Sequence, residues 1–366
     1  MRVVIAPDSF KGTASATQVA TALADGWRSV RPNDELVLLP MADGGEGTVD
    51  AFEMAVPGSI RMPVHVHGPD NADVDAHWLL LPPTAQYPAG TAVVELANTS
   101  GITLLDPLLP FDAHSLGFGE AIAAAMDHGV DRLVLAIGGS SSTDGGVGAL
   151  RALGGVFLDE HERPIALGNR GLGELTGLDL SGVRPPPAGG AQILCDVTNP
   201  LLGPAGAAAV FGPQKGATAV QIDELERGLT RLAGFLPAHA DAAGSGAAGG
   251  TGFGLLHWGA TMAPGAAAVG EALGLPDSVA TAAVVITGEG RFDSQSAAGK
   301  VPSYLAQLAA DAGARAMLVA GAIEAQPTGF AHAIALGELA GSRSAAMTAT
   351  QRWLRQAGAE FARAVG

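Results

Sequence analysis

Short apolar runs recur along the chain, and most are followed by a polar, glycine-rich segment. The runs, each as long as a short buried strand, are residues 3–6, 36–39, 133–137, 193–195, 284–286 and 317–320. Helical periodicity follows several of them: over residues 15–28, Val19, Leu23 and Trp27 share one face. Further helices are predicted from about Thr48, around Leu150 and over about 304–312. This alternation predicts an α/β fold with mainly parallel sheets.

Polar loops are expected at the carboxyl ends of these strands. They cover residues 7–13, 41–47, 138–148, 195–216 and 287–300. Ligands of open α/β sheets bind beyond the carboxyl ends of the strands, so the loops indicate a shared cleft. The region 58–90 differs, because its runs 61–67 and 76–80 are typical of antiparallel strands. Residues 182–190 contain three consecutive prolines and are predicted to form a surface loop.

Composition narrows the function classes. A chain of 366 residues with 48% hydrophobic residues can form two domains with large cores. Its net charge of −16 and the lack of a basic run argue against nucleic acid and against an anionic membrane surface as partners of this protein. Cys195 is the sole cysteine, so no intramolecular disulfide can form. No signal peptide or membrane-spanning run is evident, and a cytoplasmic protein is expected.

The lysines are the first candidate functional residues. Lys11, Lys215 and Lys300 are the three lysines among 20 basic residues, and each lies beside a glycine in a predicted loop. Lysine offers a compact charge suited to phosphate, for which arginine is not a free substitute. We therefore predict that at least two of them bind anionic groups.

Carboxylates lie in similar loops. Asp43 and Asp144 each begin a D-G-G-x-G pattern between a predicted strand and a helix. Glycine there lets the backbone approach an anion, while the carboxylate can hold Mg²⁺ or accept a proton. Both aspartates could instead cap helices, and this alternative stays open.

Two further loops concentrate polar side chains. The first contains Glu289, Arg291, Asp293 and Gln295. Burying so many polar side chains in one loop is unfavourable unless they bind a ligand or pair with one another. The second, which follows Cys195, offers Asp196 and Asn199 as contacts to substrate or metal, and leads to 211–216.

Two nucleotide-binding motifs are weak or absent. Residues 294–301 lack the first glycine and the final hydroxyl of a P-loop. Residues 244–249 match G-x-G-x-x-G, but no strand is predicted before them, so a clamp over phosphate or substrate is the preferred interpretation. A nicotinamide-linked hydroxy-acid dehydrogenase remains an alternative on this match. His65 and His67 alternate on one predicted strand and are assigned a structural role.

Taken in order, the loops resemble those of the type I (bacterial) glycerate kinase family. The matching segments are 6–12, 40–48, 95–101, 137–148, 195–203, 210–217 and 287–300. Two departures are visible: Ser140-Ser141-Ser142-Thr143 replaces S-A-T-N before Asp144, and Gly117-Phe118-Gly119-Glu120 replaces G-T-G-E.

The resemblance implies a fold and a reaction. The fold would pair a discontinuous flavodoxin-like or Rossmann-like domain (1–60 with 281–366) with an inserted α/β domain (61–280), with a cleft between them. The expected reaction is transfer of phosphate from Mg·ATP to D-glycerate, giving 2-phosphoglycerate or, less favoured, 3-phosphoglycerate, and ADP. A monomer or homodimer is expected. A non-catalytic glycerate or nucleotide sensor on the same fold is the other alternative.

Residue roles follow from the resemblance and from the side-chain chemistry. The expected catalytic residues are Asp196 as base, Lys11 and Arg291. The expected substrate and phosphate contacts are Ser9, Lys11, Asn98, Ser140, Asp144, Asn199, Lys215, Gln295 and Lys300. The expected magnesium ligands are Asp43, Glu289 and Asp293.

Overall fold

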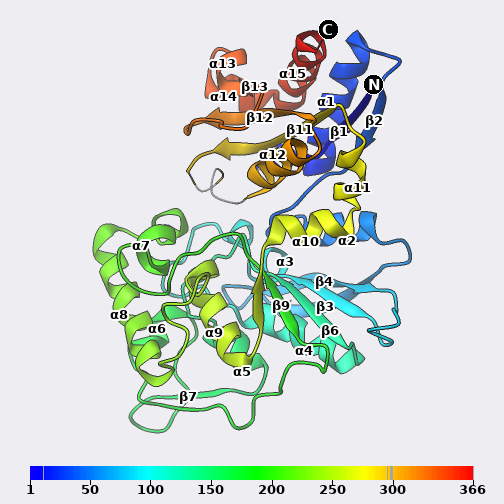
Figure 1. Ribbon diagram of the computed structural model, residues 1–366. Helices are drawn as coiled ribbons and strands as arrows, with labels where there is room; N and C mark the ends of the chain where they lie inside the picture. Colours follow the sequence, from blue (N-terminus) through cyan, green and yellow to red (C-terminus); the bar gives the residue numbers. More distant parts are fainter. Residues whose placement is uncertain (11, 295, 297–299, 366) are drawn as a thin grey trace. The chain divides into compact units, whose positions relative to one another are not determined.

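The chain forms two compact units (Figure 1). The computed structural model describes residues 1–10, 12–294, 296 and 300–365. The first unit comprises Met1–Asp43, Asp50–Ala55 and Pro264–Gly366, and the second comprises Gly44–Val49 and Val56–Ala263. The domain boundaries expected from the sequence assign 44–49, 56–60 and 264–280 differently, and they remain a prediction.

A parallel sheet organises the first unit. Its strand order is β13-β12-β11-β1-β2, and every neighbouring pair is parallel. The strands are β1 (Arg2–Ile5), β2 (Glu35–Leu38), β11 (Val284–Phe292), β12 (Arg315–Ile323) and β13 (His332–Ala335). The helices are α1 (Ala16–Val30), α10 (Gly265–Ala272), α11 (Leu275–Ala280), α12 (Val301–Asp311), α13 (Leu336–Leu339), α14 (Arg343–Thr348) and α15 (Thr350–Ala364). Helix α2 (Thr48–Ala55) follows β2 in the chain.

Helices α1 and α15 lie side by side in this unit (Figure 1). Helix α1 begins with a capping box in which Ser15 accepts from Gln18 N–H and Gln18 accepts from Ser15 N–H. Gly26 permits the close packing, because a Cβ there would lie 1.9 Å from the carbonyl oxygen of Arg355. The buried apolar face of α1, which includes Trp27, therefore joins α15 in one core.

The strand order places a topological switch point between β1 and β11. From β1 the chain passes to β2 on one side, whereas β11, β12 and β13 succeed one another on the other side. Asp8 N–H donates to Gly288 O (2.8 Å), so the loop after β1 runs alongside β11. Such a switch point is the usual ligand site of an open parallel sheet.

The second unit is built on a mixed sheet with the order β10-β9-β6-β5-β4-β3. Its strands are β3 (Ile60–His67), β4 (Asp73–Leu81), β5 (Thr91–Glu95), β6 (Arg132–Ala136), β9 (Ala191–Leu194) and β10 (Thr261–Ala263). The α-helices are α3 (Ala97–Ser100), α4 (Leu116–His128), α5 (Val147–Ala152), α6 (Gly168–Leu172), α7 (Ala207–Phe211), α8 (Ala219–Phe235) and α9 (Thr251–Trp258). Short 3₁₀ turns are η1 (Ile102–Leu104), η2 (Pro213–Lys215) and η3 (Ala247–Gly250).

Strand direction divides this sheet into two parts. Strands β5, β6, β9 and β10 are parallel, so the loops after them leave from one edge. Strands β3 and β4 pair antiparallel, as the sequence predicted. The structural role predicted for two histidines is also found: His65 pairs with Asp75, and His67 Nδ1 lies 2.7 Å from Glu120.

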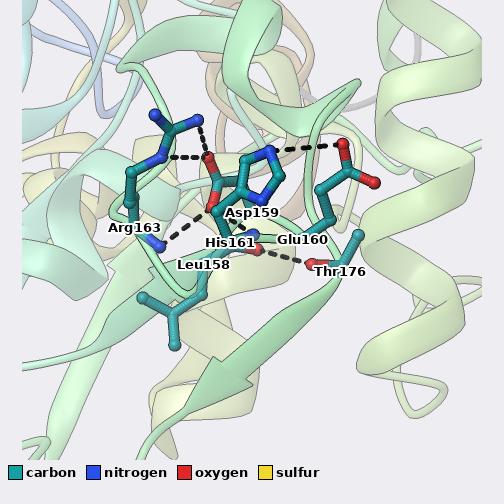
Figure 2. Close-up of polar contacts among 6 residues, drawn as sticks. All are labelled: Leu158, Asp159, Glu160, His161, Arg163 and Thr176. Carbon is teal, nitrogen blue, oxygen red and sulfur yellow. Dashed lines mark hydrogen bonds and ion pairs between the residues drawn. The ribbon is translucent and has the colours of Figure 1, made fainter.

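Strands β7 (Val156–Leu158) and β8 (Gly177–Asp179) form a separate two-stranded antiparallel sheet. Figure 2 shows the turn after β7, where Asp159 accepts from the backbone N–H groups of His161 and Arg163 and from the Arg163 guanidinium. The backbone N–H and guanidinium of Arg163 and the N–H of His161 lower the pKa of Asp159 to about 2. All of these contacts are local to the turn between Leu158 and Pro164, so the cluster stabilises that turn.

The predicted α/β class is confirmed, and two local predictions are wrong. Residues 287–292 belong to β11 and not to a loop, because Glu289 and Arg291 pair with β12 and Phe292 is buried. Lys215 belongs to η2 and not to an open loop, since Pro213 initiates the turn and Gly216 ends it. Within the described part of the chain, no helix is both long and apolar enough to span a membrane.

Candidate active site

The switch point of the first unit gathers several of the predicted residues. Ser9 follows β1, and its N–H donates to the carboxylate of buried Asp8 (2.6 Å). The Ser9 Oγ is buried and has no partner among the described residues. Thr287 Oγ1 donates to Ala6 O (3.0 Å) and ties the loop after β1 to β11. The loop is thus tied to β11, and the Ser9 hydroxyl, which has no partner in the part of the chain described, could bind a ligand.

Glu289 is the central acidic group of this cluster. Its side chain is 7% exposed, and its Oε1 has no hydrogen-bond partner among the described residues. Burial raises the pKa of Glu289 to about 7, and the neighbouring charges of Asp43 and Asp293 act in the same direction. A hydrogen bond from Ser296 and the charge of Lys300 oppose the rise. A buried, unpaired carboxylate oxygen is costly unless a cation or donor approaches it.

Other predicted residues of this unit lie on the loop before α2, on β11 and at the start of α12. Met41 N–H donates to Pro7 O (2.8 Å), which brings the loop before Asp43 beside the loop after β1. Lys300 is the N-cap residue of α12. Arg291 is exposed and lies 3.8 Å from Glu324. Lys11 and Gln295, which were also predicted here, lie outside the described residues.

Asp293 closes the turn after β11. Its Oδ1 accepts from Ser296 N–H (3.2 Å), and Ser296 Oγ also contacts Arg291 O. This turn holds the carboxylates of Glu289 and Asp293 close enough to influence each other.

The predicted magnesium ligands do not form a ready-made cage. Among the described residues, no group of three or more His, Cys, Asp or Glu side chains is placed to hold a metal ion. Mg²⁺ in phosphate-transfer sites needs only one or two carboxylates, because waters and substrate phosphates complete its shell. The unpaired Oε1 of Glu289, with Asp43 and Asp293 nearby, fits that lighter requirement.

A second cluster forms around residues 140–143 of the second unit, which we call the serine loop. Ser141 donates to Ser100 O through both its N–H and its hydroxyl, and Asn169 donates to Thr143 O (2.8 Å). Neither Ser142 Oγ nor Thr143 Oγ1, both buried, has a partner among the described residues. The loop is firmly anchored while it retains unused hydroxyl groups.

Asp144 anchors the end of the serine loop. Its Oδ2 accepts from the N–H and hydroxyl of Ser115 and from Gly148 N–H, and its Oδ1 accepts from Gly146 N–H. The side chain is completely buried. Asp144 is not the N-cap residue of α5, which is Gly146, but its carboxylate accepts from N–H groups at the start of that helix. The predicted contact between Asp144 and substrate stays a prediction.

Lys215 contacts the serine loop and is 2% exposed. Its Nζ donates to Ser140 Oγ (2.9 Å) and to Ser142 O. Burial lowers the pKa of Lys215 to about 7, although the charge of Asp144 acts to raise it. Gly249 makes room for the ammonium group, since a Cβ there would lie 2.8 Å from Nζ.

Three other predicted residues lie on the loops after β5 and β9. Asn98 donates to His77 O (3.1 Å), and its buried Oδ1 has no partner among the described residues. Asp196 is half-buried, two residues beyond the end of β9. Asn199 donates to Ala205 O (2.8 Å) and accepts through its backbone carbonyl from Gly246 N–H. Because β5, β6 and β9 are adjacent and parallel, these loops share an edge with the serine loop.

Sequence reasoning missed several supporting residues. Ser115 and Asn169 gave no signal, because their partners Asp144 and Thr143 are distant in sequence. Glu95, which accepts from Gly47 and Val49 N–H groups, lies in a motif segment but received no role. The departure at Phe118 is explained as packing, because this side chain is fully buried in the core.

The fold and these loop clusters define an α/β protein with polar, partly unsatisfied groups beyond its parallel strands. The sequence profile of the glycerate kinase family matches residues 3–366. The chain is 40% identical over 321 residues to glycerate 2-kinase of Escherichia coli K12, covering 84% of this chain and 82% of the relative. It is 41% identical over 332 residues to glycerate kinase of Bacillus subtilis 168, covering 88% and 85%.

A solved structure gives the same result. The crystal structure of "putative glycerate kinase 2" from Salmonella typhimurium LT2 superimposes with a TM-score of 0.78 at 38% identity. The match covers 100% of this chain and 98% of that one. The chain therefore belongs to the glycerate kinase family, which confirms the resemblance and the prediction of a kinase.

Proposed function

We propose that this protein transfers the γ-phosphoryl group of Mg·ATP to D-glycerate, forming 2-phosphoglycerate and ADP. Family membership supports the reaction class, and the name of the E. coli relative supports the 2-position. The geometric observation that carries the proposal lies at the switch point of a parallel sheet. There, the buried Ser9 Oγ and Glu289 Oε1 have no hydrogen-bond partner within the described part of the chain.

The nucleotide side of the reaction is assigned to the first unit. Ser9, Lys11, Arg291, Gln295 and Lys300 would contact the phosphates. Lys300 is the N-cap residue of α12, and a helix N-terminus favours anions. Asp43, Glu289 and Asp293 would hold magnesium. When bound, Mg²⁺ neutralises charge on the transferring phosphate and orients it.

The acceptor side is assigned to the second unit. Asn98, Ser140, Asp144, Asn199 and Lys215 would arrange glycerate, and Asp196 would accept the proton of the attacking hydroxyl. Phosphoryl transfer needs positioning and charge stabilisation more than covalent help, so a fixed loop is more useful than a mobile one. The anchored serine loop fits this demand.

Replacing Asp196 tests the assigned base. Asp196→Asn keeps the size of the side chain but removes its basicity, and a positioned base is worth roughly 10²–10⁴ in rate. We expect kcat for ADP release to fall by about that factor while the Kd for D-glycerate changes little. An unchanged kcat would remove Asp196 as the base and leave the kinase assignment standing.

The two alternatives have separate signatures. A nicotinamide-linked dehydrogenase would bind NADH tightly, but residues 244–249 follow α8 and not a strand, so the usual dinucleotide setting is missing there. A non-catalytic sensor would show ligand-dependent melting without turnover.

A further inference from the structure

Lys215 is a buried basic group whose direct hydrogen-bond acceptors are uncharged. None of the ion pairs formed among the described residues includes it, and its two acceptors are the hydroxyl of Ser140 and the carbonyl of Ser142. Burial of an ammonium group without a counter-charge is costly. Asp144 is the charged group that influences it, and that carboxylate is occupied by Ser115 and by the backbone at the start of α5. The sequence retains this lysine although it uses arginine for almost all other positive charge.

The direction of one hydrogen bond has a chemical consequence. Because Lys215 donates to Ser140 Oγ, the hydroxyl hydrogen of Ser140 must point to another acceptor. No described residue accepts that hydrogen. Ser140 as a whole is 7% exposed. A hydroxyl that accepts from an ammonium group is also polarised and becomes a stronger donor.

We propose that Lys215 is a positioning residue that turns the Ser140 hydroxyl into a hydrogen-bond donor for an anionic oxygen of the substrates. The ligand chemistry is a carboxylate or phosphate oxygen, supplied either by glycerate or by ATP. Lys215 acts through its hydrogen bond to Ser140 and does not contact the ligand itself. This inference rests on the proposed function and names the group that recognises one of its anions.

The surroundings of Lys215 support an indirect role. Ser142 O holds a second N–H of the ammonium group, and the Gly249 backbone lies where a side chain would collide with Nζ. Both residues are buried, with 2% of Lys215 and 7% of Ser140 exposed. Ser142 Oγ and Thr143 Oγ1 are further unpaired groups in the same loop.

Titration of Lys215 would switch this donor. Burial lowers the pKa of Lys215 to about 7, and the charge of Asp144 partly opposes this shift. Lys215 therefore changes between ammonium and amine near neutral pH. A neutral amine can accept from the Ser140 hydroxyl, which would turn the donor away from the ligand. Affinity for the anion should therefore fall as pH rises through about 7, and a bound anion should favour the ammonium form.

The test measures equilibrium binding by calorimetry, separately for D-glycerate and for Mg·ATP, at pH 6 and pH 8.5. The variants are Ser140→Ala, Lys215→Met and the double variant, with Ser59→Ala as a control at a serine distant from the cluster in the sequence. Ser140→Ala should weaken one of the two ligands by roughly tenfold or more, the effect of losing a hydrogen bond to a charged group. The ligand that is weakened identifies the source of the anion.

Two features separate positioning from simple structural damage. Lys215→Met and the double variant should each lose about as much affinity as Ser140→Ala, because the two residues act as one unit. The loss of affinity between pH 6 and pH 8.5 should be smaller in both single variants than in the wild-type protein, by the same amount in each. Glu289, whose pKa is also about 7, contributes equally to all of these proteins.

The inference and the proposed function fail in different ways. Wild-type affinity for both ligands in Ser140→Ala, with folding verified by circular dichroism, would overturn the inference. Weaker binding in Lys215→Met, with the full wild-type pH dependence retained in Ser140→Ala, would also contradict it. If Lys215→Met does not fold, Ser140→Ala and its pH profile decide alone. Failure of the wild-type protein to bind either ligand would instead count against the proposed function.

Discussion

The hydroxyl of Ser115 donates a 2.8 Å hydrogen bond to Asp144 and accepts one from Ala149 N–H (3.0 Å). It therefore joins the residue before α4 to the first turn of α5. Asp144 completes the arrangement by accepting four hydrogen bonds in a fully buried position. The serine loop is held at its far end by this carboxylate.

Removing Asp144 should destabilise the second unit strongly. In Asp144→Ala the buried N–H groups of Ser115, Gly146 and Gly148 lose their acceptor, and breaking such a network costs about 3–5 kcal/mol in the free energy of unfolding. Urea unfolding measures the loss. The control is Asp73→Ala at an exposed position of β4, expected within about 0.5 kcal/mol of the wild type. Equal effects of the two changes would refute the anchoring role.

Lys215 should make stability depend on alkaline pH. Its pKa of about 7 in the folded state lies below the ordinary value of 10.5, so the unfolded chain binds more protons between these limits. The contribution of Lys215 to the free energy of unfolding is therefore fully present above about pH 10.5. It is lost as the pH falls through about 7. We expect the free energy of unfolding of wild type relative to Lys215→Met to rise between pH 7 and pH 10. A difference that is flat or falls over this range would show that the lysine titrates normally.

Glu289 should set the requirement for magnesium. Glu289→Gln keeps the shape of the side chain but removes the charge that would attract the ion. We expect the Mg²⁺ concentration for half-maximal turnover to rise at least roughly tenfold, while the Kd for D-glycerate stays unchanged. Glu338→Gln is the matched control, because Glu338 is exposed on α13 and has no role in the assigned site. A similar magnesium dependence in both variants would exclude Glu289 as a ligand.

Strands and helices followed from the local pattern because the periodicity of apolar residues is a local property. The strand at 3–6 and the helix at 15–28 were found within two residues of β1 and α1. Strand β11 was cut short in the prediction, since Gly288 and Gly290 suggest a loop and only pairing with β12 shows otherwise.

The candidate site was less accessible to sequence reasoning. Asp43, Asp144 and Glu289 could be selected from residue type and spacing, but their differing surroundings could not. Asp144 is saturated with hydrogen bonds, whereas Glu289 Oε1 has no partner among the described residues. Those differences depend on residues such as Ser115 that only the fold brings near.

The most direct measurement is ADP release from Mg·ATP with D-glycerate, coupled in parallel to enolase, which accepts 2-phosphoglycerate. The account predicts signal in both assays, dependent on D-glycerate and on magnesium. ADP without an enolase signal would move the phosphate to the 3-position or change the acceptor. No ADP above background from folded protein would contradict the central claim.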